Sequence, residues 1–218
     1  MPVNKTSLAK RQTTKVSKLK PLSLLILECD AQKLQRQSLS FAGDLFKVVS
    51  LLPAKITVEV GLINSKEDFS KILIVCSEKY SSIKNIVVIG HSNRALICVA
   101  PNFDLEWKVF ARWLSHFKPQ KIALIACEAG QFLSTRTLFD EIPKLTKIYA
   151  SPFKTTKQQF EAIPLLISYL LLTSKQDNDT ILLGQAINFF RTGGVILQCT
   201  RRNPEGNQIL QFLGSLLE

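Results

Sequence analysis

The chain lacks several patterns that would assign it a chemistry directly. Its five cysteines include no pair spaced as Cys-x-x-Cys, which argues against a zinc site. No Gly-x-Gly-x-x-Gly motif and no Gly-x-x-x-x-Gly-Lys-Ser/Thr motif is present, so nucleotide binding has no sequence support. No internal repeat or low-complexity segment occurs in the 218 residues. We therefore expect neither a metal nor another cofactor.

Long apolar runs are also missing. The most apolar late stretch, residues 165–172, is far shorter than the roughly 18–20 residues that cross a bilayer. The charged start of the chain is not followed by the apolar core of a secretory signal. The odd, scattered set of cysteines is typical of a reducing compartment, where most thiols act as small buried hydrophobes. These features predict a cytoplasmic protein without a membrane span.

Acidic residues are absent from residues 1–20, which hold six of the basic residues behind the net charge of +11. One interpretation is a solvated, disordered leader. The other is an electrostatic contact with nucleic acid or another anionic surface. Aromatic residues are missing there too, which argues against base stacking. The predicted division is a basic, disordered tail over 1–20 and one folded domain over 21–218, where the 46% of hydrophobic residues supplies a core.

The body of the chain alternates short apolar runs with amphipathic segments. Runs that predict strands occupy residues 22–27, 55–63, 85–90, 121–126, 147–150 and 195–200. Helical spacing is found over residues 31–52, 65–76, 104–117, 134–141, 159–172, 181–191 and 205–218. Residues 94–100 alternate weakly and predict a short ribbon. This alternation is typical of an α/β domain with a mostly parallel sheet.

Two of the buried runs end in reactive residues. His91 follows the run Ile86–Ile89 and Gly90, and Cys127 follows the run 121–126. Either residue alone is more often structural, and the other histidine, His116, fits a helix C-terminus. In a parallel sheet, however, functional groups gather at the carboxyl ends of the strands. A thiol and an imidazole at one sheet edge are the parts of a cysteine nucleophile with its base.

The residues around these strand ends resemble the caspase-like cysteine peptidases. The shared pattern is strand-Gly-His at 85–91, followed by strand-Ala-Cys-x-x-Gly at 121–130. The turn resembles that of bacterial CHAT domains and metacaspases most closely, because Gly130 stands three places after Cys127. The resemblance implies a caspase-like three-layer α/β/α sandwich around a mostly parallel six-stranded sheet. It also implies a cysteine endopeptidase acting on a protein substrate, with control by an activating partner in a bacterial defence or regulatory system.

The resemblance further implies roles for individual residues. Cys127 would be the nucleophile and His91 the general base or acid. The backbone N–H groups of Ser92 and Cys127 would form the oxyanion hole. The family usually has glycine after the histidine, and Ser92 departs from that pattern. An inactive scaffold or binding module on the same fold therefore stays an alternative, as does a basic nucleic-acid-binding protein.

Substrate preference depends in this family on the end of the first strand. Here that strand ends in Glu28-Cys29-Asp30, where caspases place an arginine that holds an aspartate substrate. An acidic residue at the end of this strand resembles the arrangement of metacaspases and gingipains, which implies cleavage after Arg or Lys. Asp30 is the favoured pocket carboxylate and Glu28 the second. The alternative is that Asp30 only caps the following helix.

The segment that follows the nucleophile strand, residues 131–146, is short and has helical spacing, unlike the long cleavable linker of caspases. We therefore expect a single-chain enzyme that needs no cut in this segment.

Overall fold

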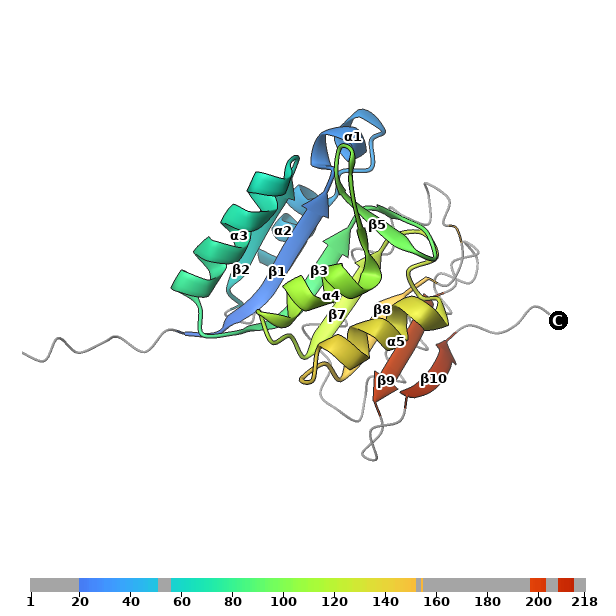
Figure 1. Cartoon of the computed structure of the whole chain (residues 1–218). Helices are drawn as coiled ribbons and strands as arrows, with labels where there is room; N and C mark the ends of the chain where they lie inside the picture. Colours follow the sequence, from blue (N-terminus) through green and yellow to red (C-terminus); the bar gives the residue numbers. More distant parts are fainter. Residues whose placement is uncertain (1–19, 51–55, 152–153, 155–196, 203–207, 214–218) are drawn as a thin grey trace, which may run out of the picture.

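A computed structural model of the chain describes residues 20–50, 56–151, 154, 197–202 and 208–213. Within these ranges the chain forms a seven-stranded central sheet in the order β10-β9-β8-β7-β3-β1-β2 (Figure 1). The five parallel strands are β1 (Leu22–Cys29), β2 (Val58–Ile63), β3 (Ile83–Ile89), β7 (Lys121–Ile125) and β8 (Lys147–Ala150). The antiparallel strands β9 (Leu197–Arg202) and β10 (Gln208–Leu213) complete one edge. The predicted α/β fold with a mostly parallel sheet is confirmed.

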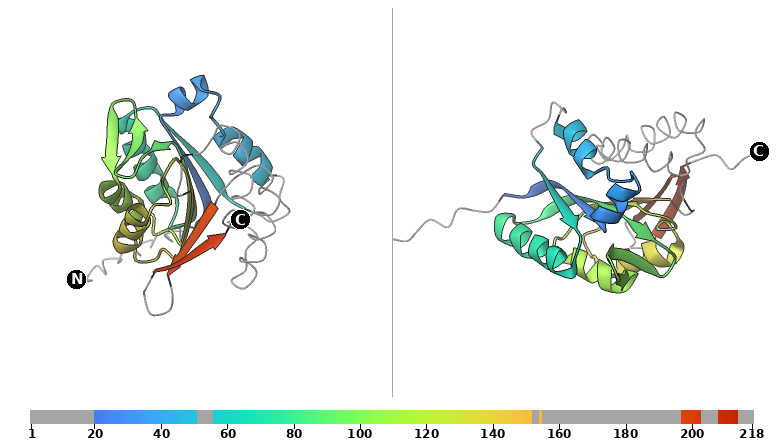
Figure 2. Two further views of the ribbon diagram at one scale, coloured as in Figure 1. Left: turned by 90° about the vertical axis from the view of Figure 1, so that its right-hand side faces the viewer. Right: turned by 90° about the horizontal axis from the view of Figure 1, so that it is seen from above.

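The central strands are buried on both faces, which explains their nearly unbroken apolar sequences. Ile86, Val87, Val88 and Ile89 of β3 are all 0% exposed, although successive side chains point to opposite faces. Both faces must therefore be covered. Figure 2 shows α3 (Lys66–Lys79), α4 (Trp107–Ser115) and α5 (Phe132–Glu141) on one face and α2 (Ala42–Ser50) on the other. The layers are those of a three-layer sandwich.

The layer of α3 and α4 is joined by aromatic packing. The ring of Phe69 stacks on Trp113 with centroids 4.7 Å apart and on Phe110 at 6.1 Å. The start of α3 follows its predicted signal, because Ser65 Oγ accepts a hydrogen bond from the N–H of Asp68. Asp68 in turn accepts one from the N–H of Asn64. The capping bonds thus fix the start of α3, and the packing of Phe69 fixes the face that it turns to α4.

The single helix expected over residues 31–52 is wrong, because the chain forms α1 (Ala31–Arg36) and α2 separately. Ser38 stands in the left-handed region with φ 55°. Its N–H donates to Gln35 O, and the N–H of Leu39 donates to Leu34 O at 2.7 Å. These two bonds make a Schellman motif, which ends α1. The motif was missed because serine, and not glycine, occupies the left-handed position.

A second, three-stranded sheet follows β3. It contains β4 (His91–Ser92), β5 (Leu96–Ala100) and β6 (Phe103–Glu106) in antiparallel order. The ribbon expected at 94–100 corresponds to β5. The helix expected from residue 104 begins only at Trp107, because residues 103–106 pair with β5. Tertiary pairing here overrides the helical spacing of Leu105 with the later apolar residues.

The C-terminal part corrects two further predictions. The sheet has seven strands where six were expected, since residues 208–213 pair with β9 as β10. A terminal helix over 205–218 is therefore wrong for residues 208–213. The helices expected at 159–172 and 181–191, and almost all of the tail over 1–20, lie outside the described residues.

Candidate active site

The strand order places a topological switch point beside β1. The chain moves outward from β1 to β2 on one side and from β3 through β7 to β8 on the other. In open α/β sheets, ligands bind at the carboxyl ends of the strands that flank such a point. Asp30 follows β1 and His91 follows β3 after one residue, so both lie at this edge.

The candidate base and nucleophile follow neighbouring strands in matching register. Ile89 of β3 pairs with Ile125 of β7, and the N–H of Gly90 donates to Ile125 O at 3.1 Å. His91 and Cys127 each lie two residues beyond this pair. Ser92 Oγ then donates to the carbonyl oxygen of Cys127 at 2.5 Å. The fold therefore brings the two predicted segments together at one edge.

The turn after β7 is held by its own backbone. Glu128 adopts the left-handed conformation with φ 57°, which reverses the chain directly after Cys127. The N–H of Gly130 donates to Ser151 O at 2.7 Å, beside the end of β8. Ser134 Oγ, from the first turn of α5, donates to Ala129 O at 2.8 Å. Cys127 is half-buried on this turn.

His91 is half-buried and faces groups from several elements. Its Nε2 is 2.9 Å from Oε1 of Gln37, the residue that ends α1. Loss of hydration lowers the pKa of His91, the charge of Lys33 lowers it further, and Asp30 opposes both effects. The ring is therefore neutral at pH 7, as a general base must be. No sequence signal marked Gln37, because an exposed glutamine at a helix end is unremarkable by composition.

Asp30 occupies the N-cap position of α1 but does not cap it. Its side chain makes no hydrogen bond to the helix, and its backbone is left-handed with φ 50°. The N–H of Asp30 donates instead to Val99 O at 2.9 Å. The thiol of Cys98 donates to Asp30 Oδ2 at 3.8 Å, while Oδ1 has no partner among the described residues. With 2% exposure, this carboxylate is a buried acceptor with unused capacity.

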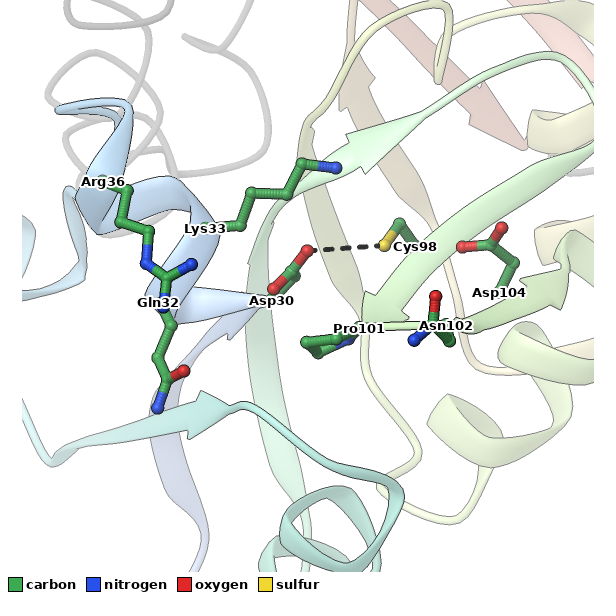
Figure 3. A pocket seen from close by; sticks show the side chains of 8 residues that line it. All are labelled: Asp30, Gln32, Lys33, Arg36, Cys98, Pro101, Asn102 and Asp104. Carbon is green, nitrogen blue, oxygen red and sulfur yellow. Dashed lines mark hydrogen bonds between the residues drawn. The ribbon is translucent and has the colours of Figure 1, made fainter.

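Asp30 lies on the wall of a pocket of about 480 Å³ at the switch point (Figure 3). Figure 3 shows Lys33 and Arg36 entering from α1 and Pro101, Asn102 and Asp104 from the facing hairpin β5–β6. The complete lining is Asp30, Gln32, Lys33, Arg36, Cys98, Pro101, Asn102 and Asp104. The pocket thus combines acidic and basic side chains and is suited to a charged ligand.

Glu28 has a different position from Asp30. It is 0% exposed, and its Oε2 accepts a 2.9 Å hydrogen bond from the N–H of Ala42, the first residue of α2. A carboxylate at a helix N-terminus is stabilised by the helix dipole. Glu28 is not among the residues that line the pocket.

Three further cysteines, Cys29, Cys76 and Cys98, have a chemistry unlike that of a nucleophile. Burial raises the pKa of Cys29 far above that of an ordinary thiol, and it also raises the pKa of Cys76. Burial, followed by the neighbouring Asp104 and Asp30 carboxylates, raises the pKa of Cys98 to about 12. All three thiols stay protonated at neutral pH, which makes them poor nucleophiles.

Neither a metal-binding cluster nor a membrane-spanning helix is found in the described part of the chain. There, no group of three or more His, Cys, Asp or Glu side chains is arranged to hold a metal ion. None of the described helices combines the length and apolarity that a bilayer crossing requires.

Solved structures of similar fold include two of a bacterial cysteine protease. Two X-ray structures of a secreted C11 cysteine protease from Bacteroides thetaiotaomicron match with TM-scores of 0.56 and 0.59, each at 9% sequence identity. The first is a complex with an irreversible peptide inhibitor, and the second is described as iotapain. The matches cover 84% of this chain and 66% and 67% of the protease chains, so this chain spans about two thirds of their length. At this identity the likeness establishes the caspase-like fold. No protein-family model and no curated protein matches the sequence.

Proposed function

We propose that the chain is a caspase-like cysteine endopeptidase that uses Cys127 as nucleophile and His91 as general base. The observation that carries this proposal is the matched register of β3 and β7, which puts both residues just beyond paired strand ends. The hydrogen bond from Ser92 to the Cys127 carbonyl supports it, because it joins the two segments directly. The cysteine-protease neighbours agree with this chemistry through their fold.

The reaction follows from the roles of the two side chains. His91 removes the proton of the Cys127 thiol, and the thiolate attacks the carbonyl carbon of the scissile peptide. The tetrahedral intermediate collapses when the protonated imidazole gives its proton to the leaving amine. Water, activated by the neutral ring, then hydrolyses the thioester and regenerates Cys127. The proposed oxyanion hole consists of the backbone N–H groups of Ser92 and Cys127.

Cleavage after a basic residue is the proposed specificity. Asp30 is buried, lines the pocket and keeps one oxygen without a partner among the described residues. A lysine or arginine side chain would give that oxygen a charge-assisted hydrogen bond. Glu28, the second candidate, also keeps its Oε1 without a partner among the described residues, but it does not line the pocket. The proposal therefore relies on Asp30.

Selective alkylation tests the proposed pair without knowledge of the substrate. The chain is treated with iodoacetamide at neutral pH, and labelled cysteines are mapped by mass spectrometry in the wild type and in His91→Ala. We expect Cys127 to be labelled first and its labelling to slow in the variant. Equal labelling of all thiols, or none at Cys127, would favour the non-catalytic binding module. His116→Ala is the matched control, since it removes the only other histidine.

The remaining assignments stay proposals of narrower scope. Membership of the CHAT group, control by an activating partner and a cytoplasmic location are expectations from the sequence, and the structural neighbours are described as secreted. A contact of residues 1–20 with nucleic acid would appear as steeply salt-dependent binding that is lost when the segment is removed.

A further inference from the structure

We infer that Gln37 is a positioning residue for His91, in an arrangement Cys127–His91–Gln37 that rests on the proposed function. The side-chain oxygen Oε1 of Gln37 lies 2.9 Å from Nε2 of His91. Gln37 is far from His91 in sequence and comes from the segment that follows β1. The contact therefore exists only because the fold closes α1 over the end of β3.

The contact selects one tautomer of the imidazole. A carbonyl oxygen can only accept, so Nε2 must carry the hydrogen that it donates to Gln37. In the neutral ring this leaves Nδ1 without a hydrogen. In the proposed reaction, Nδ1 is then the atom of His91 that can take the proton from Cys127 Sγ. After the transfer the ring is a cation, its Nε2–H still donates to Gln37 Oε1, and the negative charge is on the sulfur.

The backbone around Gln37 is fixed although its side chain is exposed. Its N–H donates to Lys33 O at 3.1 Å and to Leu34 O at 3.2 Å. The Schellman motif that follows, with Ser38 in the left-handed region, prevents the helix from continuing. Gln37 is therefore presented from a defined helix end.

A neutral amide suits this position for an electrostatic reason. His91 already faces the charges of Lys33 from α1 and Asp30 from the end of β1, and Cys98 is opposite it in the β4–β5 pair. A carboxylate in place of Gln37 would favour the charged ring. Glutamine supplies the hydrogen-bond acceptor without adding a charge, so the ring is oriented and remains neutral.

The test combines kinetics with the tautomer of His91. Gln37→Leu removes the acceptor, and Gln37→Glu keeps an acceptor but adds charge. Gln35→Leu, at another exposed position near the end of α1, is the control. We expect Gln37→Leu to lower kcat about tenfold with KM nearly unchanged. We expect Gln35→Leu to change neither kcat nor KM. We expect Gln37→Glu to retain more of kcat and to move the acidic limb of the pH profile to higher pH.

The second readout does not require cleavage. In a His116→Gln background, long-range 1H–15N spectra report which ring nitrogen of His91 carries the hydrogen. We expect hydrogen on Nε2 in the parent and a redistribution toward Nδ1 in Gln37→Leu. An unchanged tautomer together with unchanged kcat would overturn the role of Gln37. Absence of Cys127-dependent cleavage in the wild type would instead overturn the proposed function, and the spectra would still decide the hydrogen bond.

Discussion

The hydroxyl of Ser92 is bonded to the carbonyl oxygen of Cys127, so the residue after the candidate base holds the peptide of the candidate nucleophile. Glycine, the residue usual at this position in the family that the sequence resembles, has no side chain with which to make this contact. The departure from the family pattern therefore adds a connection between β4 and the turn after β7.

Ser92→Ala and Ser92→Gly should both weaken activity because each removes this bond. A hydrogen bond of this kind contributes about 1 kcal/mol, which corresponds to a loss of roughly fivefold in kcat/KM if it is felt in the transition state. Steady-state cleavage of a fluorogenic peptide measures it. Ser77→Ala, which removes a serine-to-carbonyl bond at an exposed position of α3, is the control. Greater activity of Ser92→Gly than of the wild type would contradict the prediction.

The pH dependence should follow His91. Burial and Lys33 place the folded-state pKa of His91 below its ordinary value of 6.5. The neutral base is therefore retained until the pH falls below about 6.5, and kcat/KM declines only there. Lys33→Met should shift the acidic limb toward higher pH, whereas Lys33→Arg should leave it in place. A limb above pH 7 in the wild type would be incompatible with this environment.

The same shift affects stability. The unfolded chain binds the histidine proton near pH 6.5, and the folded chain binds it only at lower pH. The unfolded state therefore gains protons first as the pH falls through this range, and the free energy of unfolding decreases until the folded pKa is reached. Comparing urea denaturation of the wild type and His91→Gln at pH 7 and pH 5 measures this contribution, which should vanish in the variant.

Asp30→Asn should remove the preference for basic substrates. Asparagine tolerates the left-handed backbone of residue 30, so the exchange removes the charge with little strain. We expect kcat/KM for peptides ending in Arg or Lys to fall by at least about a hundredfold. Asp104→Asn changes the opposite wall of the same pocket and should have a smaller effect. Preference of the wild type for peptides ending in Asp would contradict the assignment.

Activity should not require cleavage between β7 and β8. Most of residues 131–146 form α5, whose Leu138 and Phe139 are buried and whose Glu141 accepts a 3.0 Å hydrogen bond from Arg112 of α4. A protease that cuts a chain needs the cleaved segment in an extended, accessible conformation, whereas α5 is helical and packed against the rest of the fold. Intact mass spectrometry of active protein should therefore give a single uncut chain. Obligatory cleavage within residues 131–146 would refute this.

The strands were predictable because their chemistry is local. A buried strand such as Ile86–Ile89 is recognised from its own apolar sequence, without knowledge of its neighbours. The positions of His91 and Cys127 follow from where such runs end. The register of β3 against β7 is a consequence of the parallel fold. The sequence was thus sufficient for the candidate pair.

Other features depend on contacts that no local pattern records. The left-handed turn at Ser38 divides a segment whose helical spacing is continuous, and the pairing of residues 103–106 with β5 replaces a helical turn. The contact between His91 and Gln37 depends on the tertiary position of α1, which no local pattern predicts. For Asp30, the sequence was compatible with a capping role and with a substrate-binding role. The structure shows no side-chain capping bond, and the substrate-binding role stays a prediction.

The hairpin of β4 and β5 has a practical consequence for engineering. His91 pairs with Cys98, and Cys98 in turn lies on the pocket wall, where its thiol is bonded to Asp30. One short ribbon therefore carries the proposed base, His91, on one strand and a residue of the pocket wall, Cys98, on the other. We therefore expect substitutions at Cys98 to change selectivity and turnover together, and libraries directed at this wall should be screened for both properties.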